Sequence, residues 1–174
     1  MIIQTQKKLQ PQLTHDLNFI LSLKKDKRET RRHIKFVYVD NNNIVSTNGH
    51  ELRAVKNDYC FHSGFYETLK KTKSEIVLQK IADAEKNCFP DYEKMINSEG
   101  IPFIKNVIEN AESSFSLAYA YLSKDMLNFD KFVNIERFLN ICKGIQDASI
   151  FWAEKTPAIF INHTKKAALM PMCV

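Results

Sequence analysis

The side chains best suited to catalysis in this sequence are its histidines and cysteines. Cys60 and His62 stand two positions apart, and in an extended strand their side chains share one face, which suits a nucleophile with its base or a pair of metal ligands. Nothing completes such a site, because the sequence has no metalloprotease, P-loop, dinucleotide-binding or serine-hydrolase motif. Acidic Asp91, Glu93 and Glu99 are more typical of surface charge than of a carboxylate pair. We therefore expect a protein that is not an enzyme and that uses no metal or cofactor.

The length and composition are typical of one soluble domain. The chain has 174 residues and 20.2 kDa, and 44% of its residues are hydrophobic, enough to fill a core. No segment approaches the roughly 18 apolar residues of a membrane span, and the first residues lack the apolar region of a signal peptide. The four cysteines form no C-x-x-C pair. We expect a cytoplasmic protein with reduced thiols and no contact with a membrane.

Basic residues concentrate in one short run. The formal net charge is +5 with a pI near 8.9, which permits binding to a polyanion. Such a run is most often a solvated helix end, but it also suits non-specific contacts with DNA phosphates. The six cations of the run are Lys24, Lys25, Lys27, Arg28, Arg31 and Arg32.

The N-terminal third predicts a helix followed by three strands. Apolar residues recur at helical spacing over 14–25, with Thr14 as the expected N-cap, and residues 1–8 supply a strand before this helix. β-branched and aromatic residues predict strands at 34–39 and 44–47, joined by an asparagine-rich turn. Asn48 and Gly49 form a second turn before a third strand at 52–55.

The C-terminal part repeats this order of elements. A short strand at 131–133 precedes a helix that Asn134 caps and Gly144 ends, and strands follow at 148–153, 158–162 and 167–170. Between the two parts, strands are expected at 65–71, 75–81 and 115–122, with a short helix at 104–109. The segment 97–114 is expected to be an excursion or a loop.

These elements predict an α+β fold with antiparallel sheets. We expect a single domain over 1–174 that is built from two strand-helix-three-strand halves. The first half is 1–58, the second half is 131–174, and a middle segment with an insertion occupies 59–130.

Three short segments make the repeat more specific, because they resemble the bacterial DNA sliding clamp, the DNA polymerase III beta subunit. The segment Thr47-Asn48-Gly49-His50-Glu51-Leu52 resembles that family's T-D-G-H-R-L. Residues 89–95, F-P-D-Y-E-K-M, are similar to its F-P-D-Y-R-R-V, and the last residues, A-L-M-P-M-C-V, are similar to its terminal V-V-M-P-M-R-L. The resemblance implies the DNA-clamp fold, in a chain with length for one clamp domain rather than the family's three.

In the family these segments line the pocket for short peptides of DNA polymerases and of the clamp loader. The matching positions are also physically suited to peptides, since methionine adapts to varied sequences and proline gives a rigid wall. Without the other motifs, the C-terminal methionines would be ordinary core or edge residues. The peptide-binding residues implied by the resemblance are Thr47, Gly49, His50, Leu52, Pro90, Lys94, Met95, Met170, Pro171 and Met172. Glu51 and Cys173 replace two arginines of the family, which bears on which peptides bind.

The resemblance also implies that helices carry the contacts with duplex DNA. We expect a non-catalytic, sliding-clamp-like processivity protein of DNA replication or repair, which binds partner peptides and DNA and which either assembles as a homo-oligomer or acts alone. The alternative is a peptide-binding adaptor, or a competitor of clamp partners, that does not bind DNA. The expected DNA-binding residues are Lys24, Lys25, Arg28, Arg31, Arg32 and Lys143.

Overall fold

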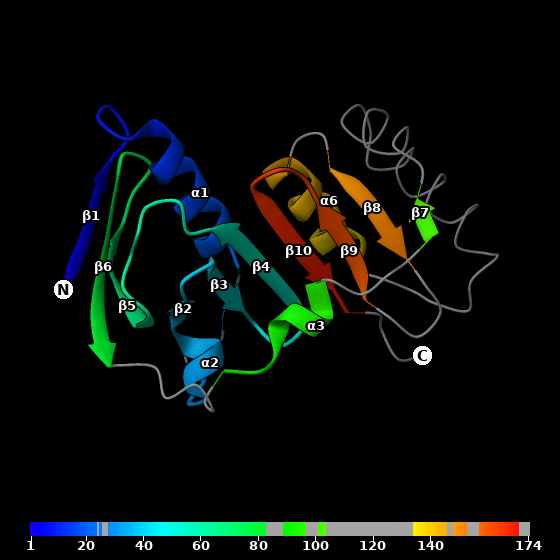
Figure 1. The fold of residues 1–174 in the computed structure, drawn as a ribbon, viewed down its shortest axis with the longest axis horizontal. Helices are drawn as coiled ribbons and strands as arrows, with labels where there is room; N and C mark the ends of the chain where they lie inside the picture. The colour runs from blue at the N-terminus through cyan, green and yellow to red at the C-terminus, as the bar shows by residue number, and fades with distance from the viewer. Residues whose placement is uncertain are drawn as a thin grey trace. The chain divides into compact units, whose positions relative to one another are not determined.

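The computed structural model describes residues 1–23, 25, 28–82, 89–96, 101–103, 134–145, 148–152 and 157–170 (Figure 1). The chain divides into two compact units, Met1–Tyr92 and Glu93–Val174. Among the helices of the described residues, none has the length and apolar character needed to cross a membrane.

The first unit is an antiparallel sheet covered by one long helix (Figure 1). Its sheet order is β1-β6-β5-β2-β3-β4, and α1 contacts β1, β3, β4 and β6. The elements are β1 (Ile2–Gln6), α1 (Pro11–Leu21), α2 (Arg32–Lys35), β2 (Val37–Val39), β3 (Asn43–Thr47), β4 (Glu51–Lys56), β5 (Gly64–Lys71) and β6 (Glu75–Ala82).

Helix α1 packs Leu17 and Ile20 fully out of solvent, as the apolar spacing predicts. Its predicted bounds were wrong at both ends. The helix begins at Pro11, whose fixed φ suits the first turn, and the Thr14 hydroxyl donates to the carbonyl of Gln10 at 2.9 Å instead of capping a start. Ser22 ends the helix, so the basic run follows α1 and is not part of it.

Strands β2, β3 and β4 form the predicted meander, with one difference at its start. The Asp40 carboxylate accepts the backbone N–H groups of Asn42 at 2.8 Å and Asn43 at 2.7 Å, which fixes the first turn. The predicted strand at 34–39 is one turn of helix, α2, followed by the shorter β2. Ile34 lies on α2 and is buried, and burial of a single apolar residue does not distinguish a helical turn from a strand.

The second unit has the sheet order β10-β9-β8-β7. Helix α6 begins as predicted at Asn134, whose side chain accepts the N–H of Arg137 at 3.0 Å. Phe138 of α6 packs edge-on against Phe160 of β9, with ring centres 5.1 Å apart. The remaining elements are α3 (Tyr92–Ile96), β7 (Ile101–Phe103), α6 (Ile135–Gly144), β8 (Ser149–Trp152), β9 (Ala158–Ile161) and β10 (Lys165–Leu169).

The α+β fold with antiparallel sheets is confirmed, as is the strand before the first helix. Strands β5 and β6 pair with β2 and β1, so they belong to the first unit rather than to a separate middle segment. The expected elements at 104–109, 115–122 and 131–133 lie outside the described residues. The single domain over 1–174 stays a prediction.

Candidate functional site

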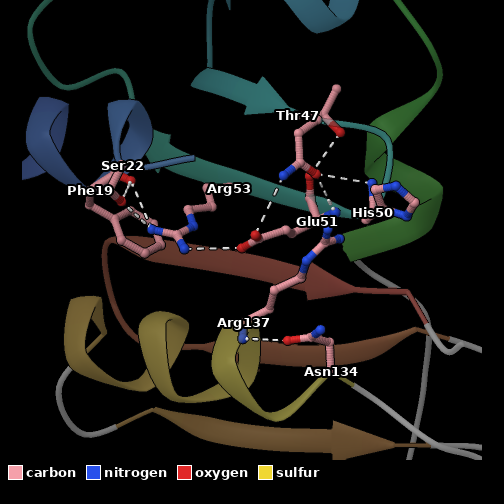
Figure 2. Close-up of polar contacts among 9 residues, drawn as sticks. Phe19, Ser22, Thr47, His50, Glu51, Arg53, Asn134 and Arg137 are labelled. Carbon is pink, nitrogen blue, oxygen red and sulfur yellow. Dashed lines mark hydrogen bonds and ion pairs between the residues drawn. The ribbon is translucent and has the colours of Figure 1, made fainter. Parts of the chain in front are cut away.

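The turn between β3 and β4 is the best-defined part of the predicted peptide site (Figure 2). The Asn48 side-chain oxygen accepts the N–H groups of His50 at 3.0 Å and Glu51 at 2.9 Å. The Thr47 hydroxyl accepts the N–H of Gly49 at 3.1 Å and donates to the Glu51 carbonyl at 2.8 Å. Gly49 has a φ of +85°, which side-chain-bearing residues rarely adopt. These bonds hold the turn in one shape.

Only two of the four residues predicted to contact a peptide in this segment are exposed. Gly49 and His50 are exposed, whereas Thr47 is buried and uses its hydroxyl within the turn. Leu52 is a core residue of β4, with 3% of its surface exposed. A peptide that reaches this segment therefore meets the His50 ring and the Gly49 backbone.

The segment around Pro90 is anchored by its two aromatic residues. The Phe89 ring stacks on Tyr38 at 4.5 Å between ring centres and is also close to Phe65. The Tyr92 hydroxyl donates to an Asp40 carboxylate oxygen and accepts from the Asn43 amide at 3.1 Å. Through these contacts, Phe89 and Tyr92 pack against the first unit. Pro90 between them is exposed.

The remaining predicted peptide residues belong to the second unit. Lys94 is exposed and Met95 is half-buried, both on α3. Met170 directly follows β10 and is 38% exposed, so its side chain is open to a ligand. Pro171 and Met172 lie outside the described residues. The convergence of the three segments into one groove stays a prediction.

A buried ion pair lies beside the turn, and sequence reasoning missed it (Figure 2). Arg53 is 2% exposed, and its guanidinium donates to the Glu51 carboxylate at 3.0 Å. It also donates to the Phe19 carbonyl at 3.2 Å and to the Ser22 hydroxyl, and it lies 5.0 Å from the centre of the Phe19 ring. Burial lowers the pKa of Arg53. Glu51, which replaces an arginine of the resembled motif, therefore has a packing partner within its own unit.

Two cations of the basic run, Lys25 and Arg31, form contacts within the protein. Lys25 donates to the carbonyls of Lys35 at 3.4 Å and Phe36 at 3.3 Å, and burial lowers its pKa to about 8. Arg31 forms a two-bond ion pair with Glu29, at 2.9 and 2.7 Å. Arg28 and Arg32 are exposed, whereas Lys24 lies outside the described residues.

The two long helices carry few exposed cations. On α1 the exposed residues after Pro11 are Gln12 and His15, and none is a lysine or arginine. On α6 the exposed residues Lys143 and Glu136 carry opposite charges, and Arg137 is half-buried. The predicted role of Lys143 as a DNA contact is therefore not reinforced by neighbouring exposed cations on its helix.

The residues considered for catalysis do not assemble in the described part of the chain. Cys60 is exposed and free, and its φ of +54° places it in the left-handed region. Burial raises the pKa of the Cys142 thiol to about 12. No group of three or more metal-ligating side chains occurs among the described residues.

Comparison of the whole structure with solved structures gives one consistent fold. The beta subunit of DNA polymerase III from Thermotoga maritima matches with a TM-score of 0.61 and 12% identity over 100% of this chain and 66% of that one. The corresponding proteins of Caulobacter crescentus (0.58, 13% identity, 99% and 66%) and Borrelia burgdorferi (0.57, 13% identity, 100% and 63%) match similarly. No family model and no curated protein sequence matches the chain.

These comparisons show that the chain has the fold of the bacterial DNA sliding clamp, as the three sequence segments predicted. The chain spans about two thirds of the length of those proteins, between 63% and 66%. Identities of 12% to 13% show likeness of fold and leave the binding partners to be argued from this chain's own residues.

Proposed function

We propose that this chain is a non-catalytic, sliding-clamp-like protein of DNA replication or repair, which acts in the cytoplasm on duplex DNA and binds the short peptides of clamp partners. The observation that carries the proposal is the clamp fold over the whole chain, together with the hydrogen-bonded turn at Asn48, which lies in one of the segments that resemble the clamp. The expected partners are a DNA polymerase or a clamp loader.

The proposed peptide site combines an apolar wall with a polar edge. Met170 and Met172 supply flexible apolar side chains, Pro90 supplies a rigid one, and His50 supplies a hydrogen-bonding ring. In the described residues, Met170, Pro90 and His50 are exposed. Thr47 and Leu52 support the site by fixing the turn and the strand beneath it, since both are buried.

Calorimetry with a short peptide that contains a glutamine followed by a Leu-Phe pair tests the site. We expect a dissociation constant of about 1 µM, equivalent to about 8 kcal/mol. Met170→Ala should weaken binding by about 1 to 2 kcal/mol through loss of apolar contact. Ile81→Ala removes an exposed apolar side chain of the first unit that lies in none of the three segments, so it serves as the matched control. The absence of binding heat at high concentration would remove the peptide site from the proposal.

Binding to duplex DNA is the second proposed activity. Contacts with phosphates release counterions, so affinity should fall steeply with salt and should not depend on base sequence. Fluorescence anisotropy of a labelled duplex at low salt measures this binding directly. Wild-type protein that fails to bind at low salt and high concentration would exclude DNA from the function while leaving the peptide site untouched.

A further inference from the structure

Five exposed lysines gather at one end of the sheet of the first unit. The end of β1 lies beside the turn between β5 and β6 (Figure 1), because Gln6 pairs with Glu75 and the Lys7 N–H donates to the Ser74 carbonyl at 2.9 Å. Residues far apart in sequence are thereby neighbours. The group, called the lysine patch, consists of Lys7, Lys8, Lys70, Lys71 and Lys73.

The charges of the lysine patch are only partly balanced. Glu75 pairs with Lys70 and also accepts a hydrogen bond from Gln4 at 2.9 Å. Lys71 donates to the Leu21 carbonyl at the end of α1, at 2.6 Å, and burial lowers its pKa, so it is engaged within the unit as Lys25 is. Within the described ranges, Lys7, Lys8 and Lys73 have no carboxylate partner. The patch therefore keeps an excess of positive charge.

The patch draws its lysines from the ends of two strands that do not pair with each other. Neighbouring strands lie about 4.8 Å apart, so the ends of β1 and β5, which flank β6, are separated by about 10 Å. Lysine ammonium groups are flexible point charges that contact phosphates without base recognition.

We propose that the lysine patch is the principal surface through which this chain contacts the phosphates of duplex DNA, in place of the exposed faces of its helices. The inference takes its ligand, duplex DNA, from the proposed function. It goes beyond that function by assigning the surface that contacts the DNA. It follows from the distribution of cations, since α1 has no exposed lysine or arginine and α6 has one exposed lysine, Lys143, together with the half-buried Arg137 and the exposed Glu136.

The test compares two double variants with the same change in net charge. Lys7→Glu with Lys73→Glu reverses two charges in the patch, and Lys35→Glu with Lys56→Glu reverses two exposed charges elsewhere in the first unit. Anisotropy with a labelled duplex should show at least a tenfold loss of affinity for the patch variant and less than a threefold loss for the control. The patch variant should also lower the slope of log affinity against log salt by about 0.9 for each phosphate contact removed.

Three outcomes decide the inference. Equal losses in the two variants would show that only net charge matters and would overturn it. A loss confined to Arg28→Glu with Arg32→Glu would also overturn it, while the proposed function in DNA binding would stand. Binding of wild-type protein to vesicles of anionic lipid, without binding to duplex, would overturn both the assignment and the proposed DNA activity. Thermal unfolding of each variant checks that the fold is intact, which we expect because Lys7 and Lys73 are exposed.

Discussion

Glu51 lies in a segment that resembles a peptide-binding motif, but its side chain pairs with Arg53 and contributes to the fold. Both are buried on β4, and Arg53 connects this strand to the end of α1 through Phe19 and Ser22. A buried pair stabilises little compared with apolar residues of equal size, but loss of one partner leaves an uncompensated charge. The Arg53 Nε and the Ser46 hydroxyl, on paired residues of β4 and β3, have no partner among the described residues. This part of the core is therefore sensitive to substitution.

The ion pair gives the first prediction. Glu51→Leu should lower the free energy of unfolding by about 3 kcal/mol, because Arg53 stays buried without its carboxylate. The double variant Glu51→Leu with Arg53→Met should recover most of this loss. Lys56→Met breaks the exposed pair with Asp58 and should change stability by less than about 1 kcal/mol. Urea denaturation measures all three variants, and a loss below about 1 kcal/mol for Glu51→Leu would contradict the structure.

Lys25 gives a prediction about pH. Burial lowers the pKa of its ammonium from the ordinary 10.5 to about 8, so the unfolded chain binds more protons between these two values. The Lys25 contribution to stability should therefore be least favourable below pH 8 and should improve as pH rises to about 10.5. After allowance for partial exposure, we expect a gain of about 1 to 2 kcal/mol in wild type relative to Lys25→Met. Denaturation of both proteins at about pH 7.5 and 10.5 measures this gain. The same difference in free energy of unfolding between wild type and Lys25→Met at both pH values would refute the prediction.

At the scale of elements, the segment of Phe89 and Tyr92 is held to the first unit by packing and hydrogen bonds. Phe89 is 8% exposed among the Tyr38 and Phe65 rings, and Tyr92 bonds to Asp40 and Asn43. These contacts fix where the chain leaves the first unit. They also present Pro90 at the surface, as the proposed peptide site requires.

Removal of the Phe89 ring gives the third prediction. Phe89→Ala should lower the free energy of unfolding by about 3 to 4 kcal/mol, because it empties a space between stacked aromatic rings. Pro90→Ala, one residue away and exposed, should change it by less than about 0.5 kcal/mol and should weaken peptide binding instead. Chemical denaturation and calorimetry separate the two effects. Similar stability losses for the two variants would contradict the division of roles.

Local signals predicted most of the elements. Helix α6 was predicted from the cap at Asn134 and the stop at Gly144, and the turns at Asp40 and Asn48 were predicted from turn-forming residue types. In both turns the structure shows a side-chain oxygen that accepts nearby backbone N–H groups. The start of α1 was missed because Pro11 and Thr14 are competing start signals three residues apart. The short α2 was missed because one helical turn carries no periodicity.

The contacts that define the candidate surfaces were harder to predict, because they join residues distant in sequence. Arg53 contacts Ser22 across 31 positions, and no pattern within β4 indicates that partner. The lysine patch depends on the register of β1 against β6, which the sequence does not show. The clustered cations at 24–32 were conspicuous in sequence, yet Lys25 and Arg31 are engaged in contacts of their own.

At the scale of the whole molecule, the edge of the sheet at β1 bears on association with further copies of the chain. In the described residues β1 pairs only with β6, so its outer edge presents unpaired backbone groups. The strand reads Ile-Ile-Gln-Thr-Gln, with no charge and no proline, and its register with β6 has no bulge. Proteins usually protect such edges with charges, prolines or bulges. Ile2, which is 61% exposed, adds apolar surface next to this edge.

We therefore expect the protein to self-associate through β1. Light scattering over a wide concentration range should give a mass that rises above the 20.2 kDa of one chain. Gln4→Lys with Gln6→Lys places charges on the exposed positions of the edge strand and should shift association to at least tenfold higher concentration. Gln79→Lys adds an exposed charge to β6, which is paired on both sides, and should have little effect. A mass of 20.2 kDa at every concentration would exclude this edge as an interface, and equal shifts in the edge and control variants would show that charge alone governs association.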